Sequence, residues 1–247
     1  MSLMVRMRWG IVVVLAFAAA LYGGDKKDKP KVEASPMVDS GSFGVFVKGQ
    51  RVATETFSVQ QDNGVSIVKS QLKEVGGSGP DQKSELQMTS SGELVRYEWS
   101  DGTGSLVVMP DGEFLREKIT TAASAKPAEQ PFLMPSATAI LDNNFFVHRE
   151  VLAWHYLGAA PCSGDAARRQ CQPLDFGVLV PQDRTSMRVR VELVGREKIT
   201  IRGTERELLR LNLKGDEFSW AFWLDDQDHF KLIRVLIADA NAEVVRD

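Results

Sequence analysis

Apolar and polar residues alternate along two long parts of the chain, 42–120 and 175–247. A period of two is typical of strands in a sheet with one buried and one wet face. In the first part, the turn sequences NG, GGSGP, SSG, DGTG and PDG separate the alternating segments. Gly and Asn accept the positive φ that tight hairpins need. The pattern therefore predicts a meander of short antiparallel strands in 42–120.

The second part repeats this pattern, most clearly in 187–194, where every second residue is apolar. Its last hairpin is expected to turn at Asp225 to Asp228. The segment around Trp220 and Phe222 is apolar on both faces. Such a strand is either covered by two layers or borders a cavity that a ligand fills.

A period of 3.6 residues marks 137–157 and predicts the helix of the chain. Its apolar stripe is expected to pack on the sheet, and Gly158 is expected to stop it. The stripe contains Leu141, Phe145, His148, Leu152 and His155. The Ala- and Pro-rich segment before it, 121–136, has no period and is expected to be a connector. The predicted fold class is mainly β (α+β), with an antiparallel sheet and one helix.

The N-terminus has the three parts of a secretory signal peptide. Arg6 and Arg8 precede the apolar run WGIVVVLAFAAALYGG, and the densely charged DKKDKPK follows it. The run is shorter than the roughly 20 residues that cross a bilayer comfortably. Residues 1–24 are therefore predicted to be a signal peptide, with a retained membrane anchor as the alternative. The expected location is periplasmic or secreted, with membrane contact only through this segment if it stays uncleaved.

Residues 25–41 are expected to be a polar linker and 42–247 a single β-rich domain. Within that domain the sequence predicts a β region 42–120, the connector 121–136, the helix 137–157, a Cys loop 158–174 and a β region 175–247. The length after the signal segment is enough to bury a sizeable core.

The charge balance argues against a nucleic-acid partner. Removing Arg6 and Arg8 from the 30 basic residues leaves 28 against 33 acidic ones, a net charge of −5. Binding to nucleic acid needs clustered Lys and Arg to neutralise phosphates. The basic cluster 26–31 lies in a polar tail and is expected to be a solvated linker.

The chain has 2 cysteines, Cys162 and Cys171. In the oxidising space that a signal peptide implies, two nearby cysteines most often form a disulfide. The spacing does not match a zinc site, and no His is near in sequence. The expected disulfide closes a small polar loop.

No sequence motif marks an active site, a metal site or a cofactor site. The chain has no G-x-S-x-G, H-E-x-x-H, P-loop or dinucleotide fingerprint. His148 and His155 are two helical turns apart, roughly 10 Å, too far to share a metal ion directly. The acidic turn at Asp225 lacks the calcium-loop pattern. No cofactor and no metal are expected.

Three segments carry a resemblance to a known architecture. They are the hairpin F-x-V-x-x-x-G-x-x-V-A-T-E-T-F, the segment ILDNNFFVHREVLAWHYL, and the ending in which SWAFWLDDQDHFKLIRV precedes VVR. They resemble uncharacterised periplasmic β-rich families of unknown function, over 43–246. The resemblance implies a strongly curved antiparallel meander sheet, an unclosed barrel that wraps one central helix, similar to lipoprotein carriers and sensors. It brings no catalytic residues.

The leading hypothesis is an exported envelope protein that binds an apolar small molecule or a protein partner without catalysis. The alternatives are a hydrolytic enzyme using His148 or His155, and a structural or assembly factor without a ligand. The side chains predicted to face a ligand are Leu141, Phe145, His148, Leu152, His155, Trp220 and Phe222.

Overall fold

The computed structural model describes residues 37–247, except 78, 80, 124–125, 134–137 and 166–167. All described residues belong to one unit of the chain, Ser35–Asp247. The predicted signal peptide, 1–24, lies outside the described residues, and so does the predicted linker up to residue 36. The remainder of the predicted linker, up to residue 41, is part of a strand, because β1 begins at Met37.

The described residues form β-strands, one α-helix and two short 3-10 turns, and this helix is too short to traverse a bilayer. The helix is α1 (Val147–Ala159), and the turns are η1 (Pro181–Asp183) and η2 (Ala238–Ala240). The first strands are β1 (Met37–Val47), β2 (Gln50–Asp62), β3 (Val65–Glu74), β4 (Gln82–Thr89), β5 (Leu94–Ser100), β6 (Gly104–Asp111), β7 (Phe114–Thr121), β8 (Ala128–Leu133) and β9 (Thr138–Ile140). After them come β10 (Cys162–Ser163), β11 (Gln170–Cys171), β12 (Leu174–Val180), β13 (Thr185–Ile201), β14 (Thr204–Lys214), β15 (Ser219–Asp225), β16 (Lys231–Ile237) and β17 (Ala242–Arg246).

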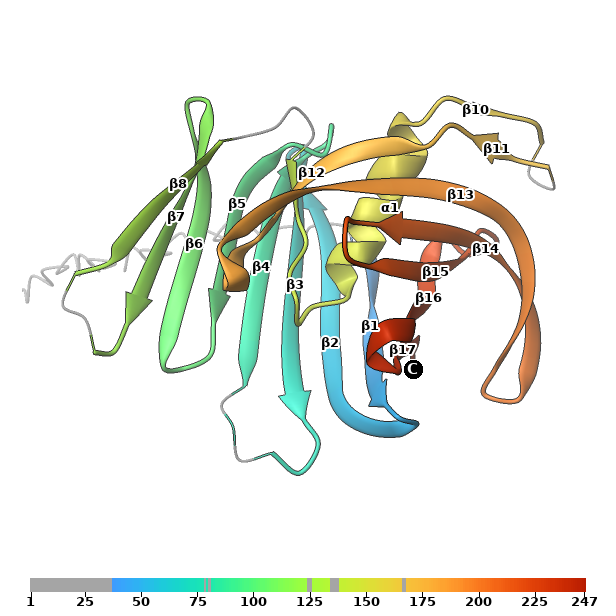
Figure 1. The fold of residues 1–247 in the computed structure, drawn as a ribbon, viewed down its shortest axis with the longest axis horizontal. Coiled ribbons are helices and arrows are strands. Elements are labelled where there is room, and N and C mark those ends of the chain that lie inside the picture. Colours follow the sequence, from blue (N-terminus) through green and yellow to red (C-terminus); the bar gives the residue numbers. More distant parts are fainter. Residues whose placement is uncertain (1–36, 78, 80, 124–125, 134–137, 166–167) are drawn as a thin grey trace, which may run out of the picture. The chain divides into compact units, whose positions relative to one another are not determined.

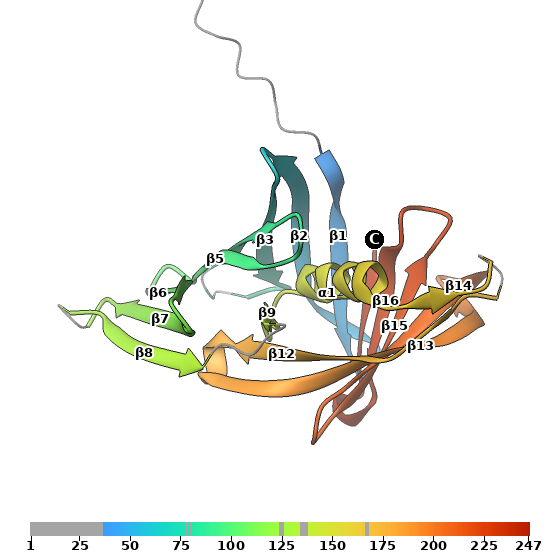
Figure 2. The same ribbon diagram turned by 90° about the horizontal axis from the view of Figure 1, so that it is seen from above.

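Fifteen of these strands form one sheet, in the order β8-β7-β6-β5-β4-β3-β2-β1-β17-β16-β15-β14-β13-β12-β9. Neighbouring strands are antiparallel, except that β9 and β12 are parallel. The edges β8 and β9 are not paired with each other, so the sheet stays open. It curves around α1, with β1–β3 on one side of the helix and β12–β14 on the other (Figures 1 and 2). The predicted fold class, a curved unclosed antiparallel sheet around one helix, is confirmed.

The first and last described strands join the two β regions into this single sheet. In the β1–β17 pairing, Phe43 lies opposite Arg246 and Val47 opposite Ala242. At the end of the pair, the Ser42 hydroxyl donates to the carboxylate of Asp247 at 2.8 Å. The sheet is therefore continuous only after a contact between strands from opposite ends of the domain has formed.

The helix is shorter than the sequence predicts, since it runs over Val147–Ala159 and not over 137–157. Residues 138–140 form β9 instead, and the Leu141 N–H continues this pairing by donating to the Leu179 carbonyl at 2.9 Å. The apolar residues before the helix complete a sheet edge. Tertiary pairing therefore overrides the helical period in this segment.

Two buried carboxylates fix where the helix begins. Asp142 accepts hydrogen bonds from the N–H groups of Asn144 at 2.7 Å and Phe145 at 3.2 Å. Glu55 of β2 accepts from the next two N–H groups, at 2.6 and 3.3 Å. The first N–H groups of a helix have no partner inside it, so acceptors supplied from outside set its start.

The helix end and the predicted connector also differ from expectation. Gly158 does not stop the helix but lies in its last turn, which the Ala160 N–H closes on the Tyr156 carbonyl at 2.8 Å. The predicted connector 121–136 contains β8, which pairs with β7. Pro131 is tolerated there because β8 is an edge strand with one side unpaired.

Strand β15 is covered on both faces. Of the two alternatives that its sequence leaves open, the structure therefore has the strand between two layers and not beside a cavity. Phe222 belongs to the main core cluster between α1 and the sheet. Trp223 points to the opposite face, where a second cluster covers it. The other buried members of the second cluster are Ile201, Leu208, Ala221, Ile233 and Val245. The turn after β15 lies at Asp225–Asp228, as predicted.

A β-bulge lets the β13–β14 hairpin contribute to both clusters. Leu193 pairs with Leu211, but the next paired residue of β13 is Gly195, opposite Arg210. One extra residue moves the side chains that follow it to the other face of the sheet. Leu193 therefore packs against the main cluster and Ile199 against the second. Gly195 has a φ of +134°, which an L side chain rarely adopts.

The main core predicts a large effect of one truncation in the helix. Leu152 is 2% exposed and packs inside the main cluster. Leu152→Ala is expected to lower the free energy of unfolding by about 2–5 kcal/mol, because it leaves a cavity. Urea denaturation followed by circular dichroism measures this change. Leu133→Ala is the matched control, since Leu133 is 70% exposed.

Equal destabilisation by Leu152→Ala and Leu133→Ala would contradict the packing of α1 in the core. The control is expected to change the free energy of unfolding by less than about 0.5 kcal/mol.

Candidate functional site

Most of the residues that the sequence predicts to face a ligand lie in the packed core. The buried ones, each at most 2% exposed, are Leu141, Phe145, His148, Leu152 and Phe222. Trp220 is half-buried, and its ring packs on Phe218 with 4.9 Å between centroids. His155 lines an open cleft. The structure thus separates His155 from the other candidates, which surround the helix on its covered side.

The covered side of α1 holds a network of buried charges. Glu55 lies under the helix start and also accepts a hydrogen bond from the Ser70 hydroxyl at 2.7 Å. Burial raises the pKa of Glu55 from 4.5 to about 7, against the lowering effect of its hydrogen bonds with Ser70 and the helix N–H groups. The positive end of the helix dipole faces this carboxylate and stabilises its charged form.

Asp142 and Arg149 form the second part of the network. Tyr97 donates its hydroxyl to Asp142, and the Gln182 amide donates to the same carboxylate at 2.6 Å. The Arg149 guanidinium donates to the Phe145 carbonyl at 2.7 Å. It also lies over the Trp220 ring, 4.9 Å from the centroid. Burial lowers the pKa of Arg149 from its usual value to about 10, so it stays charged at neutral pH.

Two further buried groups have no hydrogen-bond partner among the described residues. They are both ring nitrogens of His148 and both carboxylate oxygens of Glu117. Burial lowers the pKa of His148 from 6.5 to about 4 and raises that of Glu117 from 4.5 to about 7. His148 is therefore a neutral ring in a sealed core, in edge contact with Tyr97. Its ring is 1% exposed and does not line the open clefts beside α1.

The open side of α1 forms one wall of a cleft of about 390 Å³, which we call the apolar cleft. Its other walls come from β1, β2, β3 and the turn after β4. Its larger side chains are Val38, Val59, Gln61, Val68, Met88, Val151, Trp154 and His155. The hydroxyl groups of Ser66, Thr89, Ser90 and Ser91 border the cleft. The apolar cleft thus combines an aliphatic and aromatic lining with a few polar groups, as ligand pockets usually do.

A second cleft, of about 370 Å³, adjoins the first, and we call it the basic cleft. Its charged lining consists of Arg169, Lys231 and Asp39, and His229 also lines it. Both clefts are lined by Val38, Trp154 and Gly158, so they meet over the last turns of α1. Together they are called the groove below.

Trp154 and Gly158 shape the junction of the groove. The Trp154 indole donates to the Phe230 carbonyl at 2.9 Å, which holds the ring against the turn between β15 and β16. Phe230 and His229 both have a left-handed backbone, with φ of 56° and 54°. A Cβ added at Gly158 would meet no atom within 4 Å. The glycine therefore leaves open space at the point where the two clefts join.

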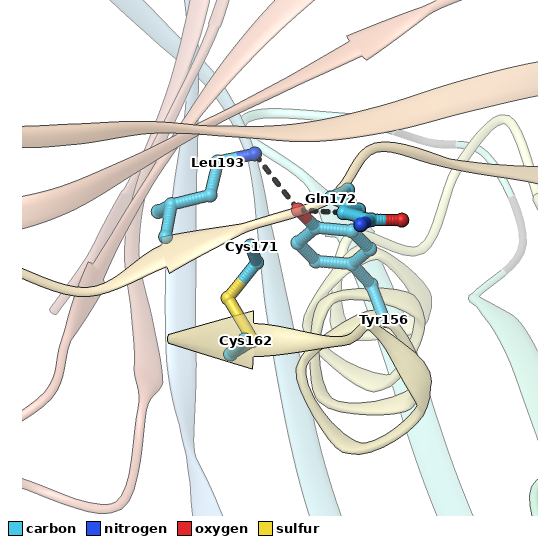
Figure 3. The surroundings of a disulfide bond; sticks show 5 residues. All are labelled: Tyr156, Cys162, Cys171, Gln172 and Leu193. Carbon is cyan, nitrogen blue, oxygen red and sulfur yellow. Dashed lines mark hydrogen bonds between the residues drawn. A yellow bond between two sulfur atoms is a disulfide. The ribbon is translucent and has the colours of Figure 1, made fainter. Parts of the chain in front are cut away.

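The disulfide loop positions Arg169 at the groove. Cys162 and Cys171 are bonded and face each other in the short β10–β11 pair, which confirms the predicted disulfide. Tyr156 of α1 anchors the loop (Figure 3), because its hydroxyl donates to the Gln172 carbonyl at 3.2 Å. The Tyr156 hydroxyl oxygen also accepts a hydrogen bond from the Leu193 N–H at 3.0 Å, and this bond connects the loop to β13.

His155 lies in the apolar cleft without a described catalytic partner. Its ring packs closely on Gly92, where an added Cβ would lie 2.9 Å from the ring. It makes an edge contact with Phe176, and burial lowers its pKa. In the described part of the chain, no group of three His, Cys, Asp or Glu side chains could hold a metal ion.

A larger hollow, of about 540 Å³, lies on the other face of the sheet, over β2–β6. Its lining is mostly polar and includes Lys69 and Glu85, which form an exposed ion pair at 3.4 Å. A wide hollow lined by solvated side chains gives a small ligand little apolar surface to bury. The groove beside α1 is therefore the better candidate site.

Sequence reasoning missed the residues that shape the groove. Trp154 is not among the residues that the sequence predicts to face a ligand, and Gly158 is predicted only to end the helix. Arg169 and Lys231 carried no assigned role. A Trp on the border of the apolar stripe, one turn before a Gly, is the only local signal of an open helix face.

Comparisons with known proteins leave the site unassigned. No protein-family model and no curated protein matches the chain. Among solved structures, the chain is similar to a β-barrel-like protein of the domain of unknown function DUF1849 from Brucella abortus, with 6% identity and a TM-score of 0.43. That match covers 86% of this chain and 95% of the other.

The buried carboxyl of Glu117 predicts a pH-dependent stability. Because its pKa is raised from 4.5 to about 7, the folded state favours the protonated form. This contribution to stability is present below pH 4.5 and is lost as the pH rises through 7. Glu117→Gln removes the ionisation, so its stability relative to the native protein should rise by up to about 3 kcal/mol between pH 4 and pH 8.

Urea denaturation at the two pH values measures the Glu117→Gln difference. Glu113→Gln, a change at an exposed glutamate of the β6–β7 turn, is the control and should show no comparable rise. A Glu117→Gln variant whose relative stability is the same at both pH values would show that the carboxyl is not held in a desolvated site.

Proposed function

We propose that this protein is an exported, non-catalytic binding protein of the cell envelope that holds an apolar small molecule in the groove beside α1. The observation that carries the proposal is the apolar cleft of about 390 Å³, whose lining is largely aliphatic and aromatic. This volume lies in the range of small-molecule sites. Export is the part of the proposal that comes from the predicted signal peptide, 1–24.

The contrast between the two sides of α1 supports a binding role. On the covered side, residues such as Leu152 are sealed in the core. On the open side, Trp154 and Leu157 stay half-buried at the groove. A ligand chain lying there would complete their burial, at about 25 cal/mol per Å² of apolar surface.

The main alternative is a hydrolase that uses His155. The observation in its favour is that Ser66, Ser90, Ser91 and His155 line the same cleft. A serine nucleophile also needs a base within hydrogen-bond reach and a group that orients that base. The described residues that line the apolar cleft include no carboxylate, and no hydrogen bond joins His155 to a described serine. Binding is therefore preferred over hydrolysis.

Filling the junction of the groove at Gly158 tests the proposal. Gly158→Phe places a ring where an added Cβ meets no atom within 4 Å, so it should block the groove without disturbing the core. The probe is N-phenyl-1-naphthylamine, a neutral apolar dye whose fluorescence rises on burial. The native protein should bind it saturably, and Gly158→Phe should weaken binding at least tenfold.

Gly158→Ala is the matched control for the groove-filling variant. A methyl group leaves most of the junction open, so dye binding should stay within about twofold of the native protein. Replacing a helical Gly should also stabilise the variant by about 0.5–1 kcal/mol. A native protein that does not bind the dye, or a folded Gly158→Phe variant that binds it normally, would overturn the proposal.

The hydrolase alternative makes a separate prediction about His155. If His155 is a general base, the native protein should cleave p-nitrophenyl butyrate above the rate of heat-denatured protein, and His155→Gln should abolish this. If the groove only binds, no such activity appears, and His155→Gln retains dye binding. Ester cleavage that is lost in His155→Gln would replace the binding proposal with the enzymatic one.

A further inference from the structure

The two clefts of the groove differ in chemistry, and this difference specifies a ligand class. We infer that the groove binds a long-chain fatty acid, with its alkyl chain in the apolar cleft and its carboxylate at Arg169 in the basic cleft. This inference rests on the proposed function, because it names the ligand of the same site. It rests on the apolar side chains of one cleft and the charged side chains of the other, which lie on either side of Trp154.

The basic cleft has an excess positive charge that its own carboxylates do not cancel. Asp39 is buried and pairs with Arg246 at 2.5 Å, and Arg246 also lies 3.4 Å from the carboxylate of Glu150. Lys231 pairs with Asp228 at 3.0 Å and lies 3.7 Å from Asp39. Arg169 is half-buried, and no described carboxylate pairs with it. One guanidinium therefore remains available at the end of an apolar cleft.

Stacking on a ring holds Arg169 in position, and its N–H donors are not bonded to a described carboxylate. Its guanidinium lies over the Phe230 ring, 5.1 Å from the centroid. Phe230 in turn accepts the hydrogen bond from Trp154, so the arginine, the ring and the junction of the groove form one packed unit. A guanidinium stacked in this way presents a planar set of donors, which matches a carboxylate in a bidentate pair.

The disulfide loop restricts where this charge can go. Arg169 lies in the loop that Cys162 and Cys171 close. The Gln172 N–H also donates to the Pro161 carbonyl at 3.0 Å, which closes the base of the loop. Arg168, its neighbour, lies in the same loop but is exposed and does not line the groove. The two arginines therefore share the loop and the charge but differ in access to the ligand.

The size of the apolar cleft favours one alkyl chain. Its volume of about 390 Å³ lies near the lower limit of small-molecule sites. A diacyl phospholipid carries two chains and would leave one of them in water. A single-chain anion places one tail and one head group in the two adjoining clefts. The carboxylate of a fatty acid fits the single available guanidinium by charge and by shape.

Competition between ligands of equal chain length tests the inference. Dodecanoate and dodecan-1-ol are titrated against the bound dye N-phenyl-1-naphthylamine at pH 8 and low ionic strength, below the concentration at which dodecanoate aggregates. The native protein should bind dodecanoate at least tenfold more tightly than the alcohol. Arg169→Gln should reduce this preference to less than threefold, whereas Arg168→Gln should retain it.

The outcomes separate the inference from the proposed function. If the native protein does not bind the dye, the proposed function fails. If the dye binds but acid and alcohol compete equally, only the inference fails. If a single-chain lysophosphatidylglycerol with a dodecanoyl chain competes better than dodecanoate, the head group is a phosphate, and the assignment to a fatty acid is overturned. If Arg168→Gln lowers the preference as much as Arg169→Gln, net charge rather than the built site attracts the acid.

A second variant tests whether the disulfide positions the guanidinium. Cys162→Ser combined with Cys171→Ser keeps both arginines and the full charge of the loop. The preference for dodecanoate over dodecan-1-ol should fall at least threefold, while binding of the neutral dye stays unchanged. If the folded double variant keeps the preference unchanged, the disulfide is not needed to position the Arg169 guanidinium at the ligand.

Discussion

The hydrogen bonds from the start of α1 to the carboxylate of Glu55 are the contact on which the rest of the structure depends. A 13-residue helix is marginal in water by itself, so its stability has to come from tertiary contacts. Its first N–H groups are buried and would be costly without acceptors. Glu55 supplies the acceptor from β2, and it precedes the two donors by 91 and 92 residues in the chain. The helix is therefore fixed to the sheet at its N-terminal end.

Fixing one end of α1 determines which of its faces is covered. With the start held at Glu55 and Asp142, the side chains of His148, Arg149 and Leu152 point into the closed interior. The last turns then carry Trp154 and Gly158 along the groove. The groove lies between this end of the helix, the strands β1–β4, the disulfide loop and the turn before β16.

The buried charges of the interior hold the start of the helix in place. Glu55 and Asp142 accept hydrogen bonds from the backbone around the helix start, and Arg149 donates to a backbone carbonyl of the same turn. Each ion is thus paired with peptide groups that would otherwise be buried without partners. Perturbed pKa values often mark active sites, but structural networks also produce them. Here the network is sealed, and the accessible chemistry lies on the other side of the helix.

The sequence by itself determined most of the strands of the two β regions, their hairpin turns, the amphipathic segment, the disulfide and the fold class. Alternation, turn dipeptides and cysteine spacing are local signals, and a strand with one buried face needs no distant partner to be identified.

Only the tertiary structure decided that the helix begins at Val147, because the acceptors that set its start come from β2 and from Asp142. It also decided that 138–141 complete a sheet edge, and that Pro131 belongs to an edge strand. The groove could not be predicted, because Trp154, Arg169 and Lys231 come from three separate segments, α1, the disulfide loop and β16, and meet only in the folded chain. Periodicity reports that a face is apolar, whereas the distant segments that fold against it decide whether it is buried or left open for a ligand.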